Sequence, residues 1–186
     1  MNELKPVTIE SERLVLRMVS LQDKVSLFRN WASDSLASKY YSFNTYEKPE
    51  EFNDYLQFII HYHGNNEAFW VIELKDSYEC IGMIEAERRK STYTNVEIGF
   101  SIGSLYYGCG YATEAVKALI CFLFKDFRAH IVTAHMTSAF EDGGRVFERA
   151  GMKKEAVLRE RRIHPDTNDF CDLNIYSITE EEFING

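Results

Sequence analysis

The chain has 186 residues, of which 45% are hydrophobic, and a formal net charge of -8 at pH 7. This length and composition fit one globular domain with a sizeable core, so we predict a single domain over residues 1–186. The acidic balance argues against a nucleic-acid partner and suits a cationic substrate. No apolar run approaches the roughly 20 residues that span a bilayer, and the N-terminus lacks the apolar core of a signal peptide. We therefore expect no membrane partner and a cytoplasmic location.

The cysteines show no metal-ligand spacing, because no Cys-x-x-Cys pair occurs among Cys80, Cys109, Cys121 and Cys171. Reduced thiols are the default in a cytoplasmic protein. His61 and His63 stand two apart on an expected helix, so their side chains point in different directions. We predict no metal site.

The N-terminal third predicts a strand and then a helix. Thr8 to Met18 alternates as a strand with one packed face does. Ser20 to Asp23 is typical of a helix start, since the hydroxyl can cap the first amides and the acid opposes the helix dipole. The buried stripe of this helix is expected to contain Val25, Phe28, Trp31 and Ala32.

A second helix and a hairpin follow. Pro49 to Glu51 favours a helix start, because proline suits the first turn. Two strands over 69–74 and 80–86 are separated by a polar turn. Glu85 and Glu87, near the end of the second strand, are interpreted as solvated acids.

The stretch from Asn95 to Phe127 organises the chain. Its first part alternates, with four apolar residues on one side and Glu97, Gly99, Ser101 and Gly103 on the other. A loop containing Gly108 and Gly110 then leads into a helical apolar pattern. A strand that passes through a glycine loop into a helix leaves the first helical amides unpaired beside the positive end of the dipole, which favours phosphate binding.

Two nucleotide motifs fit this loop poorly. A P-loop needs Lys at the end of its glycine run, whereas Lys117 lies well inside the helix. The dinucleotide fingerprint needs a third glycine where Thr113 stands.

The loop resembles the pyrophosphate motif of GNAT-type N-acetyltransferases, Arg/Gln-x-x-Gly-x-Gly/Ala, with Tyr107 to Ala112 as the matching run. The residues around it look like the RimJ/RimL branch of that superfamily. The resemblance implies an α/β (α+β) fold with a mixed, mostly antiparallel central sheet of about seven strands flanked by helices. It also implies acetyl-CoA as cosubstrate, with the pantetheine arm on the strand backbone and the pyrophosphate on the loop amides. The cofactor-binding residues implied in this way are Phe100, Ser101, Ile102, Gly108, Cys109, Gly110, Tyr111, Ala112, Thr113 and Phe147.

The sequence departs from the family pattern at several positions. Tyr107 replaces the usual Arg or Gln, and Cys109 replaces a frequent Lys or Arg, so less side-chain charge is available for phosphate. A strand over 131–136 and a helix over 144–150 resemble the second motif of the family, but Phe140 stands at its Asn position and Gly143 at its Ser position. Phe147 stands where many members carry a tyrosine acid. The C-terminal part predicts two more strands and a short helix capped by Thr179.

Acetyl transfer to an amine requires a neutral nitrogen and a route for the thiolate to leave. Glu97 is the candidate general base, because the resemblance places a carboxylate there, although it could instead pair with a neighbouring arginine. Ser138 is the candidate proton donor to the thiolate, with Thr137 and bound water as alternatives. The resemblance puts Trp31, Tyr40 and Tyr41 on the acceptor side, while such aromatic clusters are most often core.

We therefore predict an acetyl-CoA-dependent N-acetyltransferase that acts directly on a primary amine, either a protein N-terminus or a small amine such as a polyamine or amino-sugar. The missing motif residues favour one alternative, a catalytically degenerate acyl-CoA-binding sensor or scaffold. A nicotinamide oxidoreductase is a distant third. The sequence leaves a homodimer open.

Overall fold

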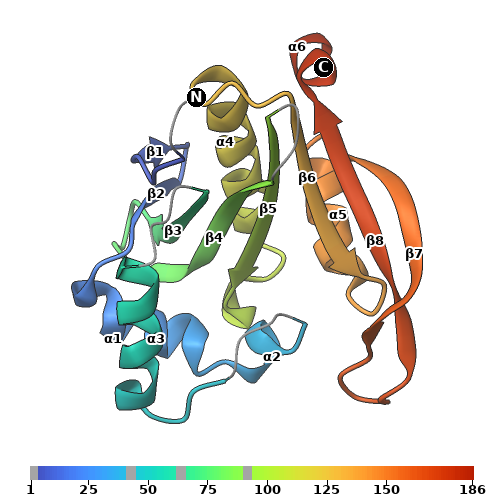
Figure 1. The fold of residues 1–186 in the computed structure, drawn as a ribbon. Coiled ribbons are helices and arrows are strands. Elements are labelled where there is room, and N and C mark those ends of the chain that lie inside the picture. The colour runs from blue at the N-terminus through green and yellow to red at the C-terminus, as the bar shows by residue number, and fades with distance from the viewer. Residues whose placement is uncertain (1–3, 41–44, 62–65, 90–93) are drawn as a thin grey trace.

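The computed structural model describes residues 4–40, 45–61, 66–89 and 94–186. Its centre is an eight-stranded sheet in the order β1-β2-β3-β4-β5-β6-β8-β7 (Figure 1). The strands are β1 (Ile9–Glu10), β2 (Leu14–Met18), β3 (Glu67–Leu74), β4 (Cys80–Arg89), β5 (Asn95–Ile102), β6 (Ile131–Thr137), β7 (Lys153–Ile163) and β8 (Phe170–Thr179). Of the neighbouring pairs, β5 and β6 run parallel and the others antiparallel. The predicted mixed, mostly antiparallel sheet is confirmed.

One more strand is present than expected, because the single strand predicted from Thr8 to Met18 is a hairpin of β1 and β2. The Ser11 N–H donates to the Leu14 carbonyl at 3.0 Å and closes the turn. The turn contains neither Gly nor Pro, so the alternation runs through it unbroken.

The helical segments are η1 (Leu21–Asp23), α1 (Lys24–Leu27), η2 (Phe28–Ala32), α2 (Ser35–Ser38), α3 (Pro49–His61), η3 (Ser104–Tyr106), α4 (Tyr111–Lys125), α5 (Glu141–Arg149) and α6 (Glu180–Asn185). The predicted stripe of the first helix was wrong at Val25, which is 73% exposed, whereas Leu27 is buried. The reason is that Asp23 pairs with Arg17 of the sheet, which turns Leu27, one helical turn later, toward the sheet. Among the described residues, no helix is long and apolar enough to cross a membrane.

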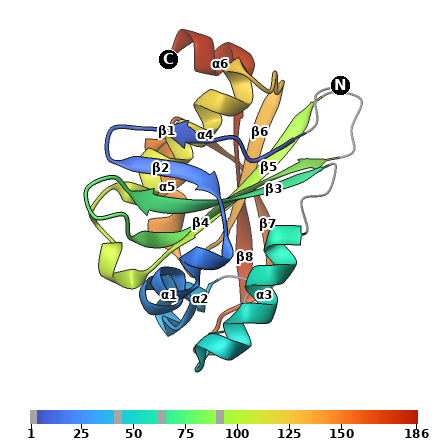
Figure 2. The same cartoon turned by 90° about the vertical axis from the view of Figure 1, so that its left-hand side faces the viewer.

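Two hydrophobic cores lie on opposite faces of the sheet. Alternate residues of β3 belong to different cores, with Trp70 and Ile72 in the first and Val71 in the second. The first core packs against α4 and α5, and the second against α1, η2, α2 and α3. Figure 2 shows α1, α2 and α3 gathered at the lower end of the molecule, with α4 toward the opposite end.

The sheet opens between β5 and β6. Their parallel pairing runs from Asn95 opposite Ile131 to Ile98 opposite Ala134 and ends there. β5 continues to Ile102 and β6 to Thr137 without further pairing to each other. The stretch of β5 from Gly99 to Ile102 is therefore not paired with β6.

Candidate functional site

The glycine loop after η3 has exposed backbone donors that suit an anion. Gly108 has φ +75° and Gly110 φ +82°, the left-handed region that favours glycine. A Cβ at Gly108 would meet no atom within 4 Å. Within the described ranges, no acceptor is found for the backbone N–H groups of Gly108, Cys109 and Gly110. These exposed donors precede the 15-residue helix α4, so a diphosphate fits the loop.

Arg13 brings to this loop a positive charge that the loop's own residues lack. Its Nη1 donates to the Cys109 carbonyl at 3.0 Å, and its Nε donates to Glu114 at 2.7 Å. The guanidinium carbon lies 4.5 Å from the centre of the Tyr111 ring. Arg13 thus ties the β1–β2 turn to the loop and offsets the charge of Glu114 in the first turn of α4. Sequence analysis missed this residue, because almost 100 positions separate it from the loop.

A pocket of about 340 Å³ lies on the β5 face that carries Glu97, Gly99 and Ser101. Its aromatic walls come from Trp31, Tyr40, Tyr55 and Phe69, and its carboxylates from Glu67, Glu85, Glu87 and Glu97. His135 and Arg162 line it on the β6 and β7 side. Glu85 and Glu87, interpreted as solvated acids near a strand end, both line this pocket, and Glu85 is exposed to solvent there. In the part of the chain that the structure describes, no three His, Cys, Asp or Glu residues are grouped to hold a metal ion.

Glu97 is held by two cationic or donor groups. Its carboxylate accepts from Arg89 Nε at 2.9 Å and from Arg89 Nη2 at 2.8 Å, and it lies 2.9 Å from His135 Nδ1. The hydrogen bond from His135 is the largest influence on its pKa, burial opposes it, and Arg89 reinforces it, so that the pKa falls to about 2. Such a carboxylate is a weak proton acceptor.

Glu85 is the contrasting carboxylate. It lies opposite Gly99 in the β4–β5 pairing, and among the residues described it has no hydrogen-bond or ion-pair partner. The Glu85 side chain is exposed to solvent at the open side of the pocket, while its carboxyl group lies among protein atoms. Burial first, and then the charges of Glu67, Glu87 and Glu97, raise its pKa. A raised pKa makes it the better proton acceptor of the two.

His135 is a further pocket residue that sequence analysis missed. Its Nδ1 faces Glu97, and its Nε2 lies 3.5 Å from Arg162 Nη2. This arrangement fits a ring that donates from Nδ1 and accepts at Nε2. The alternation of β6 could have revealed it, since His135 shares a strand face with Thr133 and Thr137.

The predicted acceptor-side residues fall partly in the pocket. Trp31 and Tyr40 line it, whereas Tyr41 lies outside the described residues. Trp31 Nε1 donates to Ser101 Oγ at 2.9 Å, and Ser101 Oγ donates to the Ala37 carbonyl at 3.2 Å. The Ser101 side chain is thus occupied, which leaves its backbone for a ligand.

Three other predicted residues lie at the border of the site. Phe100 lines the pocket, and Phe147 packs behind it in the first core, with ring centres 5.4 Å apart and outside the pocket lining. Ser138 follows the last residue of β6, and its hydroxyl accepts from the Asp172 N–H at 3.1 Å. Thr137, not Ser138, lines the pocket.

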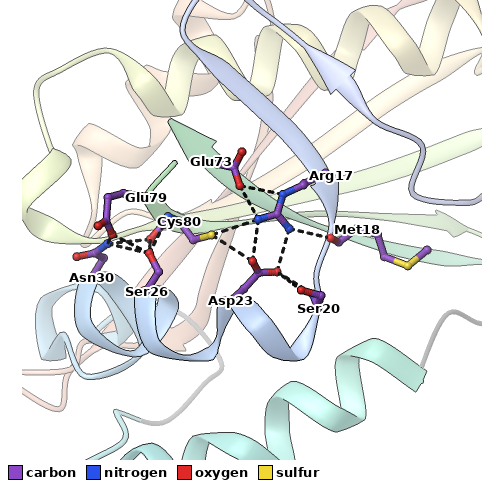
Figure 3. A network of polar contacts seen from close by, with 9 residues as sticks. All are labelled: Arg17, Met18, Ser20, Asp23, Ser26, Asn30, Glu73, Glu79 and Cys80. Atoms are coloured by element: carbon purple, nitrogen blue, oxygen red, sulfur yellow. Dashed lines mark hydrogen bonds and ion pairs between the residues drawn. The ribbon is translucent and has the colours of Figure 1, made fainter. Parts of the chain in front are cut away.

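A polar network fixes the segment that carries Trp31 (Figure 3). Arg17 on β2 bonds Glu73 on β3 and Asp23 of η1. Farther along the segment, Asn30 Nδ2 donates to Glu79 at 2.8 Å and to the Cys80 carbonyl at 3.1 Å. These bonds hold η1, α1 and η2 against the sheet, so Trp31 meets Ser101 in a fixed position.

Comparisons with known proteins show which chains and folds are similar to this one. The curated protein "Uncharacterized N-acetyltransferase YoaA" from Bacillus subtilis (strain 168) is 27% identical over 173 residues, which cover 92% of this chain and 96% of that protein. A GNAT-family acetyltransferase structure from Bacillus anthracis superposes with TM-score 0.80 at 24% identity and covers 94% of this chain and 99% of its own. A structure described as a ribosomal-protein-serine acetyltransferase from Vibrio cholerae gives TM-score 0.79 at 17% identity and covers 95% and 99%.

The family model is that of the acetyltransferase (GNAT) domain, and it matches residues 13–153. This match includes β2 to α5, and with them the glycine loop and most of the pocket. Since it spans well over half of the chain, the resemblance predicted from the sequence is confirmed, and the chain belongs to the GNAT acetyltransferase family as one of its RimJ/RimL-like members.

Proposed function

We propose that this N-acetyltransferase transfers the acetyl group of acetyl-CoA directly to a primary amine that enters the pocket. One observation carries the proposal: β5 bears the pocket residues Glu97, Gly99 and Ser101 and leads through η3 directly into the glycine loop at the start of α4. The coenzyme supplies an activated acetyl thioester. A single strand thus links a place for its phosphates to a place for the amine.

The residues proposed to hold the coenzyme are those predicted from the sequence, with one addition. The backbone of Phe100, Ser101 and Ile102 belongs to the part of β5 that is not paired with β6, and the amides of Gly108 to Thr113 surround the start of α4. Arg13 is the added cation. Phe147 contributes by packing behind Phe100.

Two carboxylates have different roles in the deprotonation of the amine in this proposal. An alkylammonium has a pKa of about 10.4 and must lose a proton before it attacks. We assign proton acceptance to Glu85, whose pKa is raised, and we keep Glu97 in catalysis as the group that positions His135 and Arg89. The backbone N–H near Phe100 is assigned to the developing oxyanion.

Ser138 keeps its predicted role as donor to the leaving thiolate. Its hydroxyl oxygen accepts from the Asp172 N–H, so the hydroxyl proton stays free to donate. Thr137, which lines the pocket, is the alternative donor.

The degenerate acyl-CoA sensor is the second candidate, favoured by Phe140, Gly143 and Phe147 at the motif positions. Two measurements separate the candidates: calorimetry with coenzyme A, and release of free thiol from acetyl-CoA with a panel of amines and N-terminal peptides. Amine-dependent thiol release is expected. Coenzyme binding without turnover of any amine would favour the sensor, and an absence of binding would reject both.

A further inference from the structure

The pocket contains an unusual row of like charges. Glu67, Glu87 and Glu97 stand directly opposite one another on β3, β4 and β5. Like charges in this cross-strand arrangement destabilise a sheet. Arg89 compensates part of the row, since it contacts Glu87 at 2.7 Å and Glu97 at 2.8 Å.

Two pocket carboxylates remain uncompensated. Glu67 and Glu85 have no hydrogen-bond or ion-pair partner within the described ranges. The basic side chains of the lining, His135 and Arg162, belong to β6 and β7, across the pocket. Negative charge is therefore concentrated on the β3–β4 side.

The walls on that side suit a cation as well. Tyr55 of α3 and Phe69 of β3 line the same part of the pocket as the two carboxylates. Aromatic faces attract cations, most strongly where water is partly excluded. Burial and the nearby Glu87 raise the pKa of Glu67, and a bound cation would relieve this unfavourable environment.

We propose that the acceptor is a linear amine with two positive charges, whose reacting nitrogen lies at Glu85 and whose second ammonium lies at Glu67. This inference rests on the proposed function. Glu85 and Glu87 are two residues apart on one face of β4, and Glu67 lies opposite Glu87 on β3. Glu67 and Glu85 are therefore diagonal cross-strand neighbours, about 7–8 Å apart. That spacing fits an alkyl chain of roughly three to five methylenes between the two nitrogens. A simple peptide N-terminus places one ammonium in the pocket and leaves Glu67 unpaired.

The test compares butylamine, 1,4-diaminobutane and a peptide with a free N-terminus and no charged side chain in the thiol-release assay. A charge-assisted contact to Glu67 predicts that kcat/KM for the diamine exceeds that for butylamine by about 10- to 100-fold. Glu67→Gln should raise the diamine KM by about tenfold and leave the butylamine KM within about twofold. The variant's kcat is compared between the two amines, because the charge of Glu67 also raises the pKa of Glu85. Glu155→Gln, on the exposed strand β7, removes the same charge elsewhere and should change neither KM.

Calorimetry with 1,4-diaminobutane alone gives a readout that does not depend on turnover. Binding of the diamine that weakens about tenfold in Glu67→Gln supports the dication site. If the protein binds the diamine in this way but acetylates no amine, the dication site stands and only the proposed function is rejected. Equal kcat/KM for butylamine and the diamine, or a preference for the peptide, overturns the inference and leaves the acetyltransferase proposal standing.

Discussion

Gly99 determines where the carboxylate of Glu85 lies, and its replacement by alanine tests whether that position matters. A Cβ at Gly99 would stand 2.8 Å from Glu85 Oε1. Heavy atoms normally approach to about 3.5 Å, so the carboxylate must move by roughly 0.7 Å or more. The atom in the way ends a flexible side chain, and we therefore expect Gly99→Ala to change the free energy of unfolding by less than about 1 kcal/mol.

The effect on catalysis should be larger than the effect on folding. Misplacing a catalytic group by about 1 Å can cost on the order of 100-fold in rate, and a general base contributes about 100-fold or more. We expect Gly99→Ala to lower kcat by about 10- to 100-fold and Glu85→Gln by about 100-fold, with coenzyme affinity within threefold of wild type. Thiol release from acetyl-CoA measures kcat, and calorimetry measures the affinity.

The double variant decides whether the two changes act through one group. If alanine works by displacing Glu85, the double variant should be at most about threefold slower than Glu85→Gln alone. Multiplicative losses would refute the reasoning, because Gly99 would then act on another group. A flattened pH profile in Glu97→Gln, together with an unchanged profile in Glu85→Gln, would return proton acceptance to Glu97.

Three further predictions concern folding and coenzyme binding. Arg17→Ala leaves the buried Asp23 without its cation, and we expect it to lower the free energy of unfolding by about 3 kcal/mol at pH 7, measured by urea titration. The control Lys75→Ala removes the cation of an exposed ion pair and should change the free energy of unfolding little. Burial opposes ionisation of Asp23, but Arg17 and Ser20 outweigh burial and lower the pKa of Asp23. The stabilisation by the Arg17–Asp23 pair is therefore fully present above the pKa of Asp23 in the unfolded chain, about 3.9, and is lost as the pH falls through its lower pKa in the folded protein. Arg13→Ala should weaken coenzyme A binding about tenfold by calorimetry, while Lys125→Ala, which removes one charge at the far end of α4, should not. Phe147→Tyr should cost about 1 to 3 kcal/mol of stability by thermal or urea unfolding without raising kcat, because its hydroxyl would be buried near Phe100 and Tyr176.

The fold was predictable wherever a local signal fixed the element. The alternation of β5, the glycine loop and the helical spacing of α4 are such signals, and so is the capping box of Thr179 and Glu182 at α6. The hairpin of β1 and β2 was missed, because its turn contains neither Gly nor Pro and the alternation continues through it. Which side of α1 faces the sheet was not predictable either, since the ion pair between Asp23 and Arg17 of β2 fixes the orientation of the helix.

The site divides in the same way. The loop follows from residues adjacent in sequence, whereas the pocket depends on which strands lie side by side and which face each residue takes. Glu67 and Glu85 look like ordinary solvated acids until β3 and β4 are placed beside β5. Arg13 reaches the loop only because β2 and the start of α4 are neighbours in the folded chain.

The departures at Phe140 and Gly143 bear on whether the second motif is degenerate. A Cβ at Gly143 would stand 2.6 Å from Phe140 Cδ1 and 2.8 Å from Met136 Cε, so the ring of Phe140 occupies the space of a side chain at 143. Phe140 in turn stacks on Tyr40 at 4.7 Å and lies 6.2 Å from Tyr107, the residue that replaces the usual Arg or Gln. The replaced positions therefore form one packed aromatic group that joins the acceptor side to the loop.

This coupling yields a prediction about the two motif positions. Gly143→Ser should lower the free energy of unfolding by about 1 to 3 kcal/mol, because the added side chain overpacks against Phe140. Phe140→Asn with Gly143→Ser removes the obstructing ring, so the double variant should be more stable than the sum of the single changes by about 1 kcal/mol or more, as measured in urea. Additive effects would show that the two departures are independent, as expected of a motif that has decayed. A clear positive coupling would identify them as one repacked structure, and repacking of this kind is compatible with an active enzyme.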